Sequence, residues 1–195
     1  MFSHETETVT PAYYAVQLPD YRMRTELTGT ARAGLLRFTF GRGGESAVFI
    51  QPNSDAGEAY LKIHPERNEV VGYNPVHRIY QGAGQRAGFS GYFVVQFDTP
   101  MVRPGMWQNG VVSPEQLRFR GSGVRQAVAA LVRFNTRPGQ VVTARVGTSF
   151  TDEAGARRNL VKELPGWDLG RVRLAAERAW NRELSRLTVT GTEAG

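Results

Sequence analysis

The sequence predicts a mainly β protein: an antiparallel two-layer β-sandwich followed by two α-helices at the C-terminal end. Two observations predict the sandwich. Residues 11–150 carry apolar side chains at alternate positions, and turn residues interrupt this pattern about every ten residues. A third observation predicts the helices, because the apolar spacing changes to three and four residues after Phe150. We therefore expect a sandwich domain over residues 1–150 and linker helices over residues 151–190.

Short strands separated by turns account for the sandwich. Most of them have apolar side chains on one face only, as in Tyr14/Val16/Leu18, Leu36/Phe38/Phe40 and Val142/Ala144/Val146. We expect the other face of these strands to lie in water. Residues 92–97 are apolar at nearly every position, which predicts a central strand that is covered on both faces.

One hairpin stands out among about ten expected strands. Residues 127–134 and 141–150 are both strand-like, and the loop between them contains Pro138 and Gly139. A loop of this length is commonly built around a type I turn. We therefore predict that these two strands pair with each other.

The first predicted helix follows residue 150. Ala156, Leu160 and Leu164 recur every four residues, which places them on one helical face. Asp152 precedes them as a candidate N-cap, and Pro165-Gly166 would end the helix.

A second helix is predicted after Asp168, which is again a suitable N-cap. Its apolar residues form one stripe at spacings of three and four, while arginines occupy the opposite face. The stripe must pack against either the sandwich or material outside this chain. Residues 187–191 resemble one more strand that would lead into a further domain. The stripe consists of Leu169, Val172, Ala176, Trp180, Leu184 and Leu187.

Composition excludes several classes of protein. Apolar residues make up 41% of the chain and aromatic residues 10%, which is too apolar for a disordered protein. No uncharged apolar run reaches the roughly 18 to 20 residues of a membrane span, and no signal peptide is visible at the start. The chain has no cysteine, so disulfides and thiol chemistry are excluded. This absence does not identify the cellular compartment.

The net charge of +6 does not predict a nucleic-acid partner. Two of the 24 basic residues are lysines, Lys62 and Lys162, and the rest are arginines. The densest arginine group, within residues 171–186, is interleaved with Glu177 and Glu183. Such mixing is typical of a solvated helix face rather than of a continuous basic stripe.

The sequence contains no recognisable catalytic or metal-binding motif. The three histidines are far apart and form no zinc signature. No serine lies in a Gly-x-Ser-x-Gly elbow, and the glycines of residues 82–88 lack the spacing and context of a dinucleotide fingerprint, so we interpret them as a loop. We therefore nominate no catalytic residue and no metal ligand.

A few residues are candidates for the rim of a sugar-binding site. His4, Glu5 and Glu7 could contact a cation or a sugar hydroxyl, and the alternative is an exposed polar edge. Trp107 lies in a predicted loop with two glycines, where a sugar ring could stack, and packing inside the domain is the alternative. Trp167 could act in the same way or could staple the start of a helix to the core.

Two ends of the chain resemble one known family. Phe2-Ser3-His4-Glu5-Thr6-Glu7, residues 11–18 (Pro-Ala-Tyr-Tyr-Ala-Val-Gln-Leu) and Glu26-Leu27-Thr28-Gly29-Thr30 resemble the amino-terminal sandwich domain of glycoside hydrolase family 92, the α-mannosidases. Independently, residues 146–168 and 179–184 resemble the segment by which that family leaves its sandwich and enters its helical barrel.

The resemblance implies a calcium-dependent, inverting exo-α-mannosidase that acts on N-glycans or mannans. In that family the catalytic carboxylates and the calcium ligands belong mainly to the helical barrel, so no catalytic residue or cofactor site is carried over to this chain. An inverting mechanism needs two carboxyl groups about 6.5 to 9.5 Å apart, and we cannot nominate such a pair. The family's sandwich also has further strands before Phe2-Ser3-His4, so we expect this chain to lack its first strands.

Two hypotheses follow. In the first, the chain is a non-catalytic domain that packs against a helical barrel and helps to shape its mannose pocket. In the second, it is a free-standing carbohydrate-binding module. The resemblance favours an extracellular or cell-envelope location. Under the first hypothesis, the predicted interface with the barrel consists of Arg157, Asn159, Pro165, Gly166, Trp167, Asp168 and Trp180.

Overall fold

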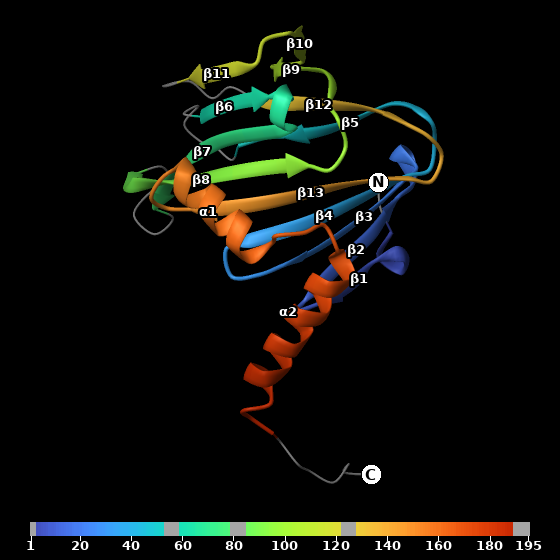
Figure 1. Cartoon of the computed structure of the whole chain (residues 1–195), viewed down its shortest axis with the longest axis vertical. Coiled ribbons are helices and arrows are strands. Elements are labelled where there is room, and N and C mark those ends of the chain that lie inside the picture. The colour runs from blue at the N-terminus through green and yellow to red at the C-terminus, as the bar shows by residue number, and fades with distance from the viewer. Residues whose placement is uncertain (1–2, 53–58, 79–84, 122–127, 189–195) are drawn as a thin grey trace.

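The computed structural model describes residues 3–52, 59–78, 85–121 and 128–188. Within these residues the chain forms two antiparallel sheets, two α-helices and three short 3-10 helices (Figure 1). The helices are η1 (His4–Thr6), η2 (Pro19–Tyr21), η3 (Pro65–Arg67), α1 (Glu153–Glu163) and α2 (Leu169–Leu184).

The two sheets are unequal in size. The large sheet has the strand order β1-β2-β3-β4-β13-β8-β7-β6-β11, and the small sheet has the order β10-β9-β12-β5. In the large sheet the strands are β1 (Thr8–Thr10), β2 (Tyr13–Leu18), β3 (Met23–Gly29), β4 (Ala33–Phe40), β13 (Gln140–Ser149), β8 (Gln85–Phe97), β7 (Glu69–Arg78), β6 (Ala59–His64) and β11 (Arg118–Gly121). In the small sheet they are β10 (Val111–Pro114), β9 (Val102–Gln108), β12 (Val128–Thr136) and β5 (Gly44–Ile50).

The main core lies between the two sheets, and it confirms the predicted two-layer sandwich. Alternate side chains of both sheets meet there, because successive residues of a strand point to opposite faces. The rings of Phe97 from the large sheet and Phe134 from the small sheet lie 5.2 Å apart between their centroids. Met106 and Val142 are completely buried in the same cluster.

The predicted hairpin is wrong. β12 pairs with β9 and β5 in the small sheet, whereas β13 pairs with β4 and β8 in the large sheet. Both edges of each strand are thus taken by partners that are distant in the sequence. The connection through Pro138 and Gly139 crosses from one sheet to the other, and Gly139 has the positive φ of +78° that its turn requires.

Helices cover part of the outer face of the large sheet, so the prediction that this face lies in water is wrong there. Leu35 of β4 and Val94 of β8 are completely buried on this face, in one cluster with Leu160 of α1. This burial confirms the prediction that residues 92–97 are covered on both faces. Gly147 of β13 allows α1 to approach, because an added Cβ would lie 2.3 Å from the carbonyl oxygen of Ala156.

At the other end of the large sheet, the inner face extends past the small sheet. The register places Val9, Tyr14, Leu27 and Leu36 side by side in one row across β1 to β4. Leu36 packs against the main core, whereas Leu27 is 40% exposed and Val9 68% exposed. An apolar strip of the inner face is therefore open to solvent.

Both helices begin at the predicted caps. Asp152 accepts a hydrogen bond from the backbone N–H of Gly155, and Asp168 accepts one from Arg171 at 3.0 Å. α2 then leaves the body of the protein, as Figure 1 shows. No helix in the described residues is both long enough and apolar enough to span a membrane.

The predicted stripe of α2 is divided between two environments. Leu169 and Val172 pack against the sandwich, in the cluster under α1. Farther along the helix, Trp180 is 47% exposed and Leu184 56% exposed, and Leu187 just beyond the helix is 81% exposed. The strand predicted at residues 187–191 lies largely outside the described residues, and so do residues 82–84 of the predicted loop. The loop prediction is wrong for Gln85–Gly88, which belong to β8.

Candidate functional site

The junction between the helices and the large sheet is held by buried charges. Glu69 of β7 is completely buried, and one of its carboxylate oxygens accepts hydrogen bonds from Arg157 of α1 and, at 2.9 Å, from Gln96 of β8. The carboxylate raises the pKa of the Arg157 guanidinium. Arg157 also bonds Glu153, one turn earlier, at 3.1 Å. A buried carboxylate needs such partners, since an unpaired charge in the interior is costly.

A second arginine fixes the corner between the two helices. The Arg145 guanidinium lies 4.5 Å from the centre of the Trp167 ring, a cation–π contact. The same group donates to the carbonyl oxygen of Leu164 at 2.8 Å and to Gln96 at 2.9 Å. Burial lowers the pKa of Arg145. The chain direction between α1 and α2 is therefore set by contacts within this domain.

A third network holds the start of α2. Glu26 of β3 accepts two hydrogen bonds from Arg37 at 2.7 Å each and one from the Tyr13 hydroxyl at 2.5 Å. The Arg37 guanidinium holds the pKa of this buried carboxyl below its ordinary value, whereas burial, and then the bond to Glu26, raise the pKa of Tyr13. The Arg173 guanidinium of α2 lies 4.0 Å from the centre of the Tyr13 ring. Arg173 is further tied to Glu177 at 2.7 Å.

Most of the predicted interface residues make contacts within this chain. Arg157, Trp167 and Asp168 take part in the contacts above, and Asn159 donates to the carbonyl oxygen of Thr148 at 2.8 Å. Pro165 and Gly166 are exposed at the corner, and Trp180 is exposed on the projecting part of α2.

The predicted rim residues lie on different parts of the sandwich. His4 Nδ1 is 2.5 Å from a carboxylate oxygen of Glu7, and hydrogen bonds from Tyr14 and then His4 lower the pKa of Glu7. Glu5 is exposed on η1. The predicted loop position of Trp107 is wrong, because this residue belongs to β9 of the small sheet and pairs with Val112 and Ala129. Its ring meets Phe49 edge to face at 6.2 Å. The structure does not bring these two groups together.

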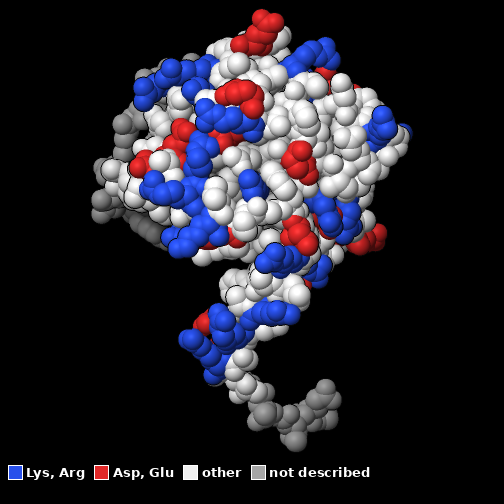
Figure 2. All heavy atoms as spheres, in the orientation of Figure 1, with Lys and Arg blue, Asp and Glu red and all other residues white. Residues whose placement is uncertain are grey.

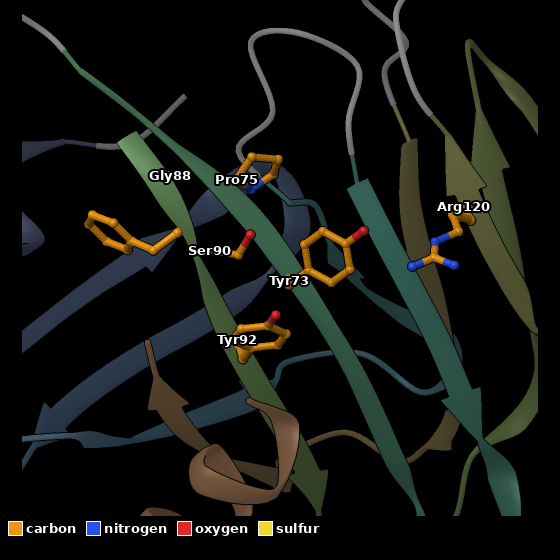
Figure 3. Close-up of a pocket in the computed structure, with 7 residues that line it drawn as sticks. Tyr73, Pro75, Gly88, Ser90, Tyr92 and Arg120 are labelled. Carbon is orange, nitrogen blue, oxygen red and sulfur yellow. The ribbon is translucent and has the colours of Figure 1, made fainter. Parts of the chain in front are cut away.

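Sequence reasoning missed a pocket on the outer face of the large sheet. It has a volume of about 360 Å³, and Tyr73, Ser90, Tyr92 and Arg120 are among the residues that line it (Figure 3). These residues come from three strands, and only the strand register brings them together. The spacing within each strand carries no signal of the site.

No metal site emerges from the described residues, since no three of their Asp, Glu or His side chains are grouped so that they could hold an ion. The described part of this chain does not fit the calcium that the resemblance implies. No chemical step through calcium is therefore assigned to it. Figure 2 shows acidic and basic side chains interleaved on the visible face of the body.

The family is established by comparison with known proteins. The profile of the Glycosyl hydrolase family 92 N-terminal domain matches residues 1–149. The chain therefore belongs to glycosyl hydrolase family 92, as its N-terminal domain. The resemblance that the sequence motifs indicated is confirmed.

Solved structures agree with this assignment. An inverting mannosidase of family GH92 from Bacteroides thetaiotaomicron superposes with a TM-score of 0.82 at 24% identity, over 97% of this chain and 24% of that one. An α-mannosidase of the same family and organism gives a TM-score of 0.79 at 28% identity, over 98% of this chain and 26% of that one. The chain thus spans about a quarter of the length of these structures.

A curated relative matches a shorter segment. Over 50 residues, the chain is 46% identical to an uncharacterized secreted glycosidase of Arthroderma benhamiae. The match covers 25% of this chain and 6% of that protein.

Proposed function

We propose that this chain is a non-catalytic domain that seats and orients the helical-barrel catalytic domain of an α-mannosidase. The parent enzyme would be a calcium-dependent, inverting exo-mannosidase acting on mannose-containing glycans such as N-glycans or mannans. Support comes from the family, and from two matched structures that are family GH92 mannosidases. The calcium ligands and both catalytic carboxylates would lie in the barrel.

The exposed stripe of α2 carries the proposal. Trp180 and Leu184 continue the helical face that Leu169 and Val172 pack against the sandwich, and Leu187 follows just beyond the helix. Large apolar side chains that are aligned on one face and lie outside the body are typical of a protein–protein contact. The barrel of the parent enzyme is the occupant that we propose for this surface.

The buried networks suit this role. Arg145 fixes the corner between the helices, Glu69 holds α1 through Arg157, and Glu26 bonds Tyr13, whose ring contacts Arg173 of α2. The direction in which the exposed stripe points is therefore set before any partner arrives. A helix whose base is already held in place loses less conformational freedom on association, which favours binding.

Two further parts of the proposal concern the sugar pocket and the location. His4, Glu5, Glu7 and Trp107 remain candidates for a rim that contacts the glycan. The open strip at Val9 and Leu27 supports the expectation that further strands of the parent chain complete the sandwich. A matched relative described as secreted supports an extracellular or cell-envelope location.

The test compares the 195-residue chain with a longer product that includes the codons after Gly195. We expect the longer product to hydrolyse an aryl α-mannoside in the presence of calcium and the chain alone to show no hydrolysis. In the longer product, Leu184→Ala should weaken the contact between the domains, so that thermal unfolding separates into two transitions. Leu174→Ala is the matched control, because Leu174 is also exposed on α2 but lies off the stripe.

Two results would overturn the proposal. One is hydrolysis by the 195-residue chain that a single Asp or Glu substitution abolishes. The other is a stop codon directly after Gly195 together with glycan binding by the chain, which would establish the free-standing module instead.

A further inference from the structure

A row of aromatic and basic side chains crosses the outer face of the large sheet beyond α1. The register places Arg120 of β11, Tyr60 of β6, Tyr73 of β7 and Tyr92 of β8 directly opposite one another. In the next row on the same face, Arg118 lies opposite Lys62. Neighbours in such a row interact side by side. We call Tyr60, Tyr73, Tyr92, Arg118 and Arg120 the Tyr–Arg groove.

The rings of the groove are ordered by mutual contact. The centroids of Tyr60 and Tyr73 are 5.7 Å apart with nearly parallel rings, and those of Tyr73 and Tyr92 are 5.6 Å apart. The guanidinium groups of Arg118 and Arg120 lie 5.5 and 5.8 Å from the centre of the Tyr60 ring. Figure 3 shows Tyr73, Tyr92 and Ser90 grouped together, with the guanidinium of Arg120 pointing toward them.

The surface is hollowed on both sides of Tyr73. One pocket of about 360 Å³ is bordered by Tyr73, Ser90, Tyr92 and Arg120. A second, of about 280 Å³, is bordered by Tyr60, Tyr73, Tyr92, Arg118 and Arg120. Small-molecule sites in proteins commonly measure about 300 to 1,000 Å³, so the combined groove could hold a ligand of one or two rings.

The polar groups of the groove have unused bonding capacity. Neither Arg118 nor Arg120 forms an ion pair with any residue that the structure describes. The hydroxyls of the three tyrosines and of Ser90 likewise form no hydrogen bond to those residues. Glu153 borders the second pocket, but its carboxylate is bound to Arg157 at 3.1 Å.

Three arginines of the domain differ from these two. Arg37, Arg157 and Arg173 each bond a carboxylate of the same domain. Structural roles thus account for those three, whereas Arg118 and Arg120 present exposed guanidinium groups beside a hollow. A guanidinium binds a carboxylate or phosphate through two parallel hydrogen bonds, which a neutral ligand cannot match.

We propose that the Tyr–Arg groove binds a sugar that carries a carboxylate or a phosphate. Arg118 and Arg120 hold the anionic group, the tyrosine rings contact the apolar C–H face of the sugar, and the tyrosine and Ser90 hydroxyls bond the sugar hydroxyls. This inference goes beyond the proposed function and does not depend on it. The groove is separate from the exposed stripe of α2, and it involves neither Trp107 nor the residues around His4.

Titration calorimetry of the 195-residue chain tests this inference, with glucuronate and glucose 6-phosphate as probes. Methyl glucoside measures the contribution of the charge, and inorganic phosphate measures the contribution of the sugar. We expect both anionic sugars to bind. Methyl glucoside should bind at least about tenfold more weakly because it lacks the charged group that the arginines hold, and inorganic phosphate at least about tenfold more weakly because it lacks the ring and hydroxyls that the tyrosines and Ser90 contact.

Variants assign the binding to the groove. Arg120→Ala should weaken binding of the anionic sugars about tenfold or more, and Tyr73→Ala should weaken binding of the sugars but not that of inorganic phosphate. Arg178→Ala removes one exposed arginine of α2 and is the matched control, with an expected change of less than about twofold. Circular dichroism and the melting temperature check that each variant folds. If Tyr73→Ala does not fold, Arg118→Ala replaces it as the second variant that assigns binding to the groove.

Four outcomes would overturn the inference. They are equal binding of methyl glucoside, equal binding of inorganic phosphate, anionic-sugar binding that Arg120→Ala and Arg118→Ala leave unchanged, and no binding of any probe. A single-stranded oligonucleotide serves as a rival ligand, because exposed aromatic and basic side chains on a sheet also suit nucleic acid. Tighter binding of the oligonucleotide than of either sugar, at the same groove, would replace the proposal.

Discussion

Glu26 is a buried carboxylate that orders the residues beneath the start of α2. Its carboxylate is 5% exposed and joins Arg37 to Tyr13, whose ring in turn contacts Arg173 of the helix. Removing one partner of a buried ion pair leaves the other without compensation. We expect Glu26→Gln to lower the free energy of unfolding by about 3 kcal/mol at pH 7.

The same substitution predicts a pH dependence. The folded state lowers the pKa of Glu26. The ionised carboxylate therefore stabilises the fold at pH values above the pKa of the unfolded state, which is about 4.3. This contribution is lost as the pH falls toward the lowered, folded-state pKa. Urea unfolding should show the cost of Glu26→Gln shrinking below about pH 4. An unchanged cost in acid would contradict this assignment, and Glu5→Gln on the exposed η1 is the control.

A second prediction concerns Gly147, where α1 lies close to the sheet. A Cβ at this position would lie 2.3 Å from the Ala156 carbonyl oxygen and 2.6 Å from the Leu160 Cβ, so α1 would have to move. We expect Gly147→Ala to cost about 1 to 3 kcal/mol in urea unfolding. A Cβ added at Gly166 would have no atom within 4 Å, so Gly166→Ala should change the free energy of unfolding by less than about 0.5 kcal/mol. Equal effects of the two substitutions would contradict the close approach of helix and sheet.

Among the elements, the helices followed closely from sequence and the sheet pairings did not. The apolar spacing and the two aspartate caps are local signals, and both helices begin where those signals predict. Strand pairing is not local, because a strand such as β12 is equally suited to a hairpin with β13 or to the pairing with β5 that the chain adopts. Alternation predicts that strands exist and leaves their partners undetermined.

The candidate sites also divide into those with a local sequence signal and those that depend on strand pairing. Trp180 was expected at an interface, because its place in a helical stripe is a local property, and its exposure is consistent with that expectation. The Tyr–Arg groove could not be expected, since Tyr60, Tyr73 and Tyr92 are far apart in sequence and meet only through the register.

The two halves of α2 should differ in stability. Residues before Ala176 contact the sandwich, whereas the described residues beyond it project into solvent, where a short isolated helical segment is marginally stable. Hydrogen exchange of the chain alone should therefore show fast amide exchange for residues 178–184 and slow exchange for residues 173–176. Uniform protection along α2 would show that the projecting half is stabilised by contacts that the structure does not contain.

At the scale of the whole molecule, truncation separates the structural core from the projecting segment. A chain ending at residue 176 keeps both sheets and the helix contacts, so we expect its melting temperature to stay within about 5 °C of the full chain. A chain ending at residue 139 loses β13, which lies between β4 and β8, and should show no cooperative unfolding. Circular dichroism during heating measures both. Cooperative melting of the shorter fragment would mean that β13 is dispensable.

The position of β12 and β13 in the chain has a consequence during synthesis. β4 pairs with β13 and β5 pairs with β12, so that Ala33 meets Gly147 and Gly44 meets Thr136. A nascent chain leaving the ribosome cannot complete either sheet until about three quarters of the 195-residue chain has emerged. Until then its apolar strand faces have no partner. Chaperones that shield β-strands during translation should therefore matter more for producing this domain than for a protein built from successive hairpins.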